Sequence, residues 1–288
     1  MKERSILALH RGQPTEDGNR VPLTRLVPGL GQRGTDAFRD MDPFLLVDHF
    51  GPMVLPPGTD AGFPPHPHKG FQTLTYLLQG AFRHRDSTGG AGRLDPGGAQ
   101  LMTAGRGIVH EEMPVPEHLE TGGAIEGVQI WINLPRARKE DPPGYVDLQP
   151  AAMPWVPVPG GRIRVLAGTA AGVTGPAQTP VPLLCAHLEL EAGAAFALPL
   201  PPAWMAAVIP LAGTVRIGEA EAGPDTVARL GDGDGAVLGA VTAASVMVLA
   251  GEPLREPIAH YGPFVMNTPE EIQRAFEDYQ AGRFGTIG

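Results

Sequence analysis

The chain has 288 residues, a net charge of −9 and one cysteine, Cys185. A length of this order suggests two domains. The negative charge argues against direct binding of nucleic acid, because neutralising phosphates needs clustered Lys and Arg. A single cysteine cannot form an internal disulfide, and we interpret Cys185 as a small buried hydrophobe.

Hydrophobic residues make up 42% of the chain, as in a globular protein. No run approaches the roughly eighteen consecutive apolar residues of a membrane span. The first ten residues, Met1 to His10, are followed by polar residues instead of the apolar core of a secretory signal. We therefore expect a globular cytoplasmic protein that does not bind a membrane.

Residues 1–60 contain short apolar stretches broken by glycine and proline, and we expect edge strands and loops wrapped on a first barrel. Between 61 and 134, turn residues recur about every eight to twelve positions, a spacing typical of an antiparallel sandwich or barrel. The predicted strands run from Phe71 to Gln79, Ala81 to Asp86, Ala99 to Ala104, Ile108 to Met113 and Ile125 to Leu134.

Two short motifs in this region carry potential metal ligands two residues apart. His66 and His68 form one pair, and His110 and Glu112 form the other. Side chains at i and i+2 of a strand share a face. Two such pairs facing each other across a barrel would supply three imidazoles and one carboxylate, so we predict a metal site. Glu111 points the other way, and we expect it on a solvated face.

A helical reading of these motifs fails. The zinc motif H-E-x-x-H would need a histidine at position 114, where the chain has Pro114. Prolines at 64, 65 and 67 exclude a helix interior around His66 and His68. Two further histidines are weaker candidates: His84, between two arginines, is expected at the surface, and His49 has no paired ligand.

Residues 135–161 are rich in proline and show no sustained period, so we predict a linker between a first domain at 1–134 and a second at 162–288. Strand and turn signals resume from 162 to about 258, which indicates a second barrel. It has no pair of motifs that could face each other. His187 is therefore interpreted as a lone strand histidine with an ordinary hydrogen bond.

The tail contains the clearest helix signal, at about 268–281. Thr268 and Glu271 form a capping box, with Pro269 at the first helical position. Apolar residues then recur at helical spacing, and Gly282 ends the pattern.

Several of these motifs resemble signatures of the pirin family, which are two-barrel members of the cupin superfamily. The motifs are Asp42 to Gly51, Phe63 to His68, Thr103 to His110, Glu112 to Pro114, Gly262 to Thr268 and Gly282 to Gly285. The resemblance implies an all-β fold of two cupin-type antiparallel barrels, with the tail helix packed on a barrel as a latch. It also implies that His66, His68, His110 and Glu112 hold one metal ion in the first barrel only.

Three imidazoles and a carboxylate suit Fe(II), Mn, Ni, Cu or Zn, and four protein ligands around a six-coordinate ion leave positions for substrate or dioxygen. The resemblance favours iron. One departure affects the chemistry: many pirin-like sequences have Glu at the position of Gln72. In cupin quercetinases this Glu is thought to take the substrate's hydroxyl proton, which an amide cannot do. Strand parity places Gln72 on the face of His66 and His68, and Glu112 or a metal-bound hydroxide would have to serve as the base.

Two functions from different classes remain open at this point. The first is a dioxygenase of quercetin-type flavonols, with a small phenolic substrate and dioxygen as partners. The second is a non-catalytic, iron-dependent regulator or redox sensor that acts through a protein partner. We expect a monomer in either case. Three serines without a G-x-S-x-G elbow argue against a serine hydrolase.

Overall fold

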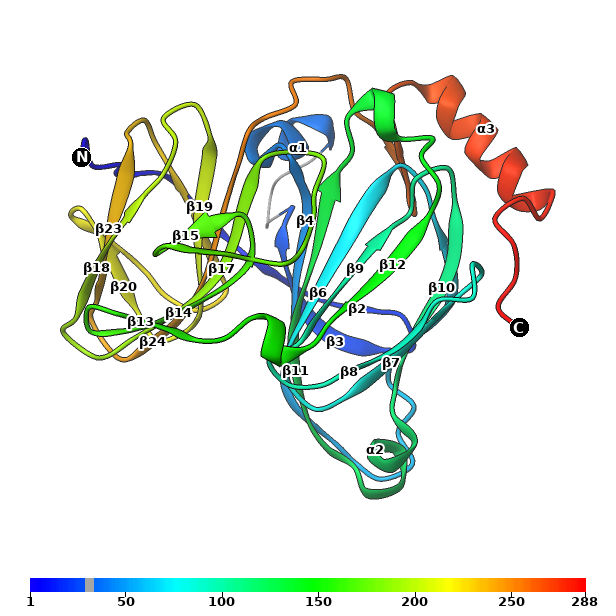
Figure 1. Ribbon diagram of the computed structural model, residues 1–288, viewed down its shortest axis with the longest axis horizontal. Coiled ribbons are helices and arrows are strands. Elements are labelled where there is room, and N and C mark those ends of the chain that lie inside the picture. The colour runs from blue at the N-terminus through cyan, green and yellow to red at the C-terminus, as the bar shows by residue number, and fades with distance from the viewer. Residues whose placement is uncertain (29–33) are drawn as a thin grey trace. The chain divides into compact units, whose positions relative to one another are not determined.

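The computed structural model describes residues 1–28 and 34–288 and consists mainly of antiparallel strands (Figure 1). These residues form two compact units that are discontinuous in sequence. One comprises 14–25, 44–150 and 255–288, and we call it the N-terminal barrel. The other comprises 1–13, 26–43 and 151–254, and we call it the C-terminal barrel.

The N-terminal barrel is built from two main sheets. Its larger sheet has seven strands in the order β12-β9-β6-β11-β4-β3-β2, and its smaller sheet has the order β5-β10-β7-β8. The strands are β2 (Gln13–Asp17), β3 (Val21–Val27), β4 (Phe44–Leu55), β5 (Phe63–His68), β6 (Phe71–Gln79), β7 (Phe82–Asp86), β8 (Ala91–Leu94), β9 (Ala99–Thr103), β10 (Ile108–Pro114), β11 (Gly123–Asn133) and β12 (Gly144–Leu148). Strands β6, β7, β9, β10 and β11 lie close to their predicted positions.

The C-terminal barrel repeats this plan with a seven-stranded sheet, β1-β22-β19-β24-β17-β14-β13, and a four-stranded sheet, β18-β23-β20-β21. Its strands, with the short pair β15-β16, are β1 (Ile6–Arg11), β13 (Val156–Val158), β14 (Gly161–Ala167), β15 (Thr169–Ala170), β16 (Val173–Thr174), β17 (Leu183–Leu190), β18 (Ala195–Pro199), β19 (Met205–Ala212), β20 (Val215–Ile217), β21 (Ala220–Ala222), β22 (Thr226–Leu230), β23 (Gly235–Ala240) and β24 (Ala244–Gly251). Its core is aliphatic, with Ile163, Leu188 and Val246 among the fully buried side chains. The expected all-β, two-barrel fold is thus confirmed.

The ends of the chain do not follow the continuous ranges expected from the sequence. Strand β1 pairs with β22, so the first residues belong to the C-terminal barrel. Strand β4 lies between β11 and β3 in the larger N-terminal sheet, and is not an edge element. Backbone pairing decides these positions, and it depends on partners that are distant in sequence.

The segment expected as a linker is also partly strand. β12 pairs with β9 in the N-terminal barrel, and β13 pairs with β14 in the C-terminal barrel. Two short 3-10 helices, η1 (Arg136–Arg138) and η2 (Pro150–Ala152), lie in the same segment. β12 contains no proline, and Pro157 is tolerated within β13 because this strand ends its sheet, where a missing N–H is tolerated.

The tail helix α3 (Pro269–Gln280) begins with the predicted capping box. Thr268 Oγ1 accepts from the backbone N–H of Glu271, and the Glu271 carboxylate accepts from the backbone N–H of Thr268. The helix buries Ala275 in a cluster with Phe264, Phe284 and Val109 of β10. It therefore packs on the N-terminal barrel, although it follows the second barrel in sequence. The short pair β25 (Ala259–Tyr261) and β26 (Phe264–Met266) precedes it.

Two further helices were not anticipated. α1 (Gly34–Met41) lies in the C-terminal barrel, and α2 (Pro116–Thr121) follows β10 with Pro116 in its first turn. α2 has no buried residue, so no apolar period could have revealed it. Among the described residues, no helix combines the length and apolar character needed to cross a membrane.

Candidate metal centre

Three histidines from two paired strands converge in the N-terminal barrel. His66 on β5 lies directly opposite His110 on β10, and His68 lies two residues further along β5. Their ring centroids are 4.3 Å apart for His66 and His110, 4.7 Å for His66 and His68, and 5.0 Å for His68 and His110. Their ligand atoms all lie within 4.8 Å of one another, and this triad could hold a metal ion.

Strand β5 can contain three prolines because it is the edge strand of its sheet. Its backbone also orients the first ligand. The Nδ1–H of His66 donates to the carbonyl oxygen of Pro64 at 2.7 Å. His68 Nδ1 lies 3.4 Å from the carbonyl oxygen of Pro263, just before β26. Because a carbonyl can only accept, Nδ1 carries the proton in both rings and Nε2 is left to bind a cation.

His110 is the buried histidine of the triad whose ring nitrogens both lack a partner in the described part of the chain. It is 1% exposed, and neither ring nitrogen has a hydrogen-bond partner among the described residues. Burial, followed by the nearby His66, His68 and His84, holds the pKa of His110 well below its usual value. Burial and then His66 do the same to the pKa of His68. Both rings are therefore neutral near pH 7, the state in which imidazole binds a metal.

Glu112 lies on the same face of β10 as His110 but is held by the opposite sheet. Its Oε1 accepts from Thr75 Oγ1 at 2.9 Å and from Gln100 Nε2, and its Oε2 accepts from Gln129 Nε2 at 2.8 Å. Thr75 pairs in register with both Gln100 and Gln129 on the neighbouring strands β9 and β11. Three adjacent strands thus present donors to one carboxylate across the barrel interior. The group of ligand atoms within 4.8 Å does not include Glu112.

Glu111 points away from the triad, but it is not solvated as expected. Only 8% of the residue is exposed, and its carboxylate lies 3.7 Å from Arg83 Nη1 and 3.6 Å from Arg85 Nη1. These two arginines on β7 cover it, because β7 pairs with β10 and places Arg85 opposite Glu111.

The same pairing turns His84 inward, against the expectation of a surface position. His84 lies opposite Glu112 and is 1% exposed. Its Nε2 lies 3.0 Å from Asp86 Oδ2, its Nδ1 has no hydrogen-bond partner among the described residues, and its ring stacks on Tyr145 at 4.0 Å. A sequence signal existed: Phe82, His84 and Asp86 alternate with two arginines, as inward and outward residues of a strand do.

Gln72 is buried, at 3% exposed, and its Nε2 donates to Thr103 Oγ1 at 2.9 Å. Its Oε1 has no hydrogen-bond partner among the described residues. The expected alternation from His68 to Gln72 is interrupted at Gly70, where φ is 90° and the chain passes from β5 in one sheet to β6 in the other. Strand parity cannot be counted through this turn.

Two aromatic side chains line His68. Trp131 and Phe71 stack at 4.2 Å, and their centroids lie 5.1 and 5.0 Å from the His68 ring. The indole Nε1–H of Trp131 donates to Gln129 Oε1 at 3.3 Å, which connects this aromatic pair to the donors around Glu112.

Comparison with known proteins agrees with this arrangement. The sequence matches the Pirin family over residues 25–132 and the Pirin C-terminal cupin domain over residues 185–285. This chain belongs to the pirin family.

Individual relatives cover nearly the whole chain. A pirin-like protein of Caulobacter vibrioides is 40% identical over 99% of this chain and 100% of its own, and the pirin of Homo sapiens is 37% identical over 89% of each. A crystal structure named quercetin 2,3-dioxygenase, from Acinetobacter baumannii, superposes with a TM-score of 0.92 at 35% identity, covering 99% of this chain and 100% of that one. The expected two-barrel cupin fold is confirmed.

The donor set fits the metal ion expected in this family. Three imidazoles suit several first-row divalent metals, and these donors do not choose among them. A buried polar atom without a partner costs about 1–3 kcal/mol, and a bound cation would give His110 the partner that it lacks.

The remaining histidine candidates have ordinary roles. His187 in the C-terminal barrel has its Nε2 2.8 Å from Ser245 Oγ, and no group of three or more potential ligands occurs among the described residues of that barrel. His49 Nε2 lies 3.2 Å from Glu126 Oε1. Sequence reasoning missed Thr75, Gln100 and Gln129, because polar residues inside a barrel give no periodic signal of their own.

Proposed function

We propose that this pirin-family chain is a metal-dependent dioxygenase that opens quercetin-type flavonols with dioxygen. One observation carries this: the ligand atoms of His66 and of the buried His68 and His110 lie within 4.8 Å of one another, and neither ring nitrogen of His110 has a partner among the described residues. The solved relative named quercetin 2,3-dioxygenase supports the substrate class. A cytoplasmic location and a monomeric state remain predictions.

The metal ligands in this proposal are His66, His68, His110 and Glu112, and the ion is one Fe(II) per chain. Glu112 shares a face of β10 with His110, and its carboxylate accepts hydrogen bonds at both oxygens. A carboxylate has about four acceptor sites, so three hydrogen bonds leave room for a further interaction. Mn, Ni, Cu and Zn would suit the same donors.

When bound, a redox-active ion would stabilise enolate or phenolate oxygens and support reaction with dioxygen. The chain's own residues would bind and orient the substrate. Trp131, which is partly exposed and stacks on the buried Phe71, would offer a flat apolar surface to a planar flavonol. The unpartnered Nδ1 of His84 is a buried group available to a substrate hydroxyl, and Asp86 holds the ring in place.

The substrate's hydroxyl proton needs an acceptor. Gln72 cannot serve, because an amide has no basic function near neutral pH. We assign this role to Glu112. With its fourth acceptor site at the metal, its carboxylate would take the proton at a position that one of its three present donors gives up.

The position of Gln72 also favours a second candidate, a non-catalytic iron-dependent regulator that acts through a protein partner. Its side chain is tied to Thr103 and supplies no base where the resemblance to the pirin family leads us to expect Glu. In this case the triad would hold iron without turnover.

Oxygen uptake separates the two candidates. The parent, Gln72→Glu and Glu112→Ala proteins are loaded to matched metal content and mixed with quercetin in an oxygen electrode, with free metal as the blank. We expect uptake by the parent that is lost in Glu112→Ala. Uptake no greater than that of free metal in all three proteins would reject the dioxygenase and leave the regulator.

A further inference from the structure

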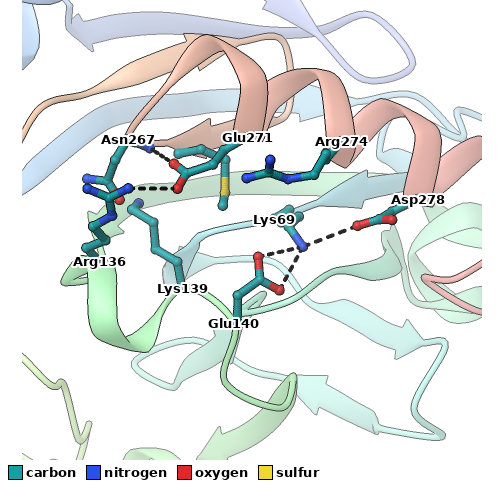
Figure 2. Close-up of a pocket in the computed structure, with 9 residues that line it drawn as sticks. Lys69, Arg136, Lys139, Glu140, Asn267, Glu271, Arg274 and Asp278 are labelled. Carbon is teal, nitrogen blue, oxygen red and sulfur yellow. Dashed lines mark hydrogen bonds and ion pairs between the residues drawn. The ribbon is translucent and has the colours of Figure 1, made fainter.

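A second pocket lies outside the histidine triad, on the side of the N-terminal barrel covered by α3 (Figure 2). Its volume is about 390 Å³, within the range of small-molecule sites. It is lined by Lys69 after β5, by Arg136, Lys139 and Glu140 after β11, and by Met266, Asn267, Glu271, Arg274 and Asp278 of the tail.

The ammonium groups of the two lysines in this pocket already bind oxygen atoms of the protein. Lys69 Nζ donates to the carbonyl oxygen of Arg106 at 2.9 Å and to Glu140 at 3.0 Å, and it lies 3.6 Å from Asp278. Lys139 Nζ donates to three oxygens, those of Gly70, Val265 and the Asn133 side chain. An ammonium has three donors, so neither lysine has one to spare for a ligand.

The two arginines are different. Arg274 is exposed, and it makes no hydrogen bond or ion pair with any residue that the structure describes. The Arg136 side chain is 61% exposed and uses one side-chain N–H, from Nη2 to Glu271 Oε1 at 3.2 Å. Figure 2 shows both side chains directed toward Glu271 from different elements. Most of their donors are free, and guanidinium groups bind oxyanions such as carboxylate and phosphate in a bidentate manner.

Glu271 offsets only part of the charge of these arginines, since it is one carboxylate beside two guanidinium groups. Its carboxylate accepts from the backbone N–H groups of Asn267 and Thr268 at 2.9 and 3.0 Å, so it is engaged with the start of α3. The pocket as a whole is lined by four basic and three acidic side chains, and burial lowers the pKa of one of the basic groups, Lys139, to about 7. The positive charge offered to a ligand is therefore that of the two arginines.

Asn267 supplies an independent sign of a ligand. It is 4% exposed, and its Nδ2 donates to Pro257 O at 2.8 Å and to Glu256 Oε2 at 3.3 Å. Because both partners are acceptors, the orientation of the amide is settled. Its Oδ1 is then a buried acceptor with no partner among the described residues, in the wall of the pocket. A ligand with a hydroxyl group would satisfy it.

We propose that this pocket binds a small oxyanion that also carries a hydroxyl donor, either a hydroxycarboxylate or hydrogen phosphate. Arg136 and Arg274 bind the oxyanion, Asn267 Oδ1 accepts from the hydroxyl, and Met266 provides an apolar contact. The site is separate from the triad and does not depend on the proposed dioxygenase activity.

Isothermal titration calorimetry on the full chain tests this with inorganic phosphate, 4-hydroxybenzoate and benzoate. We expect at least one of the first two probes to bind, and benzoate to bind more weakly than 4-hydroxybenzoate because it cannot donate to Asn267. Tighter binding of one of these two probes identifies the ligand as hydrogen phosphate or as a hydroxycarboxylate. Arg274→Gln and Arg136→Gln should each weaken binding by about tenfold or more, since each removes a charge-assisted hydrogen bond.

Arg93→Gln is the matched control. Arg93 is a half-exposed arginine on β8 of the same barrel, but it pairs with Asp95, just after this strand, and with Glu117 of α2, and it does not line the pocket. Binding should be unchanged in this variant. The proposal is overturned if neither phosphate nor 4-hydroxybenzoate binds, or if binding survives both Arg274→Gln and Arg136→Gln unchanged, as it would for a probe bound at the metal.

Discussion

Adjacent carboxylates on β10 have opposite environments. Glu112 accepts from donors inside the barrel, whereas Glu111 lies under Arg83 and Arg85 on the outer face. A one-residue slip of the strand would exchange them. This makes the pair a direct test of the metal site.

We expect His110→Ala and Glu112→Ala to lose most of the bound metal while remaining folded, because each removes one proposed ligand and leaves the strand pairing of the barrel in place. Glu111→Ala should retain it. Metal content by mass spectrometry of purified proteins, with circular dichroism as the check on folding, measures both. Loss of metal from Glu111→Ala with retention by Glu112→Ala would contradict the assignment.

Gln72 stands where the resemblance to the pirin family leads us to expect Glu. If the chain is a dioxygenase, Gln72→Glu should raise turnover of quercetin, since a positioned base contributes about a hundredfold to ten-thousandfold. The introduced carboxylate can accept from the Thr103 hydroxyl, which now accepts from Gln72 Nε2. Gln72→Ala, which adds no base, is the control. Equal rates for the Glu and Ala variants at matched metal content would argue against a base at this position.

At the scale of elements, the tail is part of the N-terminal barrel. Val265 N donates to Lys69 O at 3.1 Å, and Lys139 Nζ donates to both Gly70 O and Val265 O. Lys139 therefore connects the end of β11 and the β5–β6 turn to the tail strand β26, next to His68.

The burial of Lys139 predicts a pH dependence of stability. Burial lowers its pKa from 10.5 to about 7, against the raising effects of Glu256 and Glu271. Between these values the unfolded chain holds a proton that the folded chain has released, so the free energy of unfolding rises as pH increases from about 7 to 10.5. The rise is at most about 1.4 kcal/mol per pH unit.

Urea unfolding of the parent and of Lys139→Met, measured between pH 6 and 9, tests this pH dependence. All other titratable groups are the same in the two proteins, so the difference between their free energies of unfolding reports on Lys139. The parent should gain stability over Lys139→Met as the pH rises above about 7. A constant difference across this range would show that Lys139 keeps its proton in the folded chain, held by its three oxygen partners.

The capping box that begins α3 should also be measurable. Thr268→Ala removes the acceptor for the Glu271 N–H, and N-cap replacements of this kind cost about 1 kcal/mol. Gln273→Ala, at an exposed position of the same helix, should change the free energy of unfolding by less than about half of that. If both substitutions changed the free energy of unfolding by the same amount, the side chain of Thr268 would contribute no more to stability than an exposed residue in the middle of the helix.

At the scale of the whole molecule, the two barrels share a plan but not a metal site. We expect one metal ion per chain, because among the described residues the only group of three or more potential ligands is the triad, while His187 bonds to Ser245. Metal analysis of the parent and of His187→Ala should give the same ratio near one. A ratio near two that falls in His187→Ala would place a second ion in the C-terminal barrel.

Local information in the sequence determined much of this protein. The alternation of side chains along a strand predicted that His66 shares a face with His68 and that His110 shares a face with Glu112, and turn residues marked several strands of each barrel. The capping box of Thr268 and Glu271 determined where α3 begins. Each of these features depends on residues within a few positions of one another, which is why the sequence alone could reveal them.

Tertiary structure decided what depends on distant partners. It assigned β1 to the C-terminal barrel and α3 to the N-terminal barrel, because pairing with β22 and packing on Val109 and Phe264 are not encoded locally. It turned His84 inward and surrounded Glu112 with donors from three adjacent strands. That the two ligand strands pair side by side in one sheet, and do not face each other across the barrel, came from the structure. The register between neighbouring strands sets these contacts. Where the chain turns from one sheet to another, as at Gly70, the alternation of side chains can no longer be used to predict which face a residue occupies.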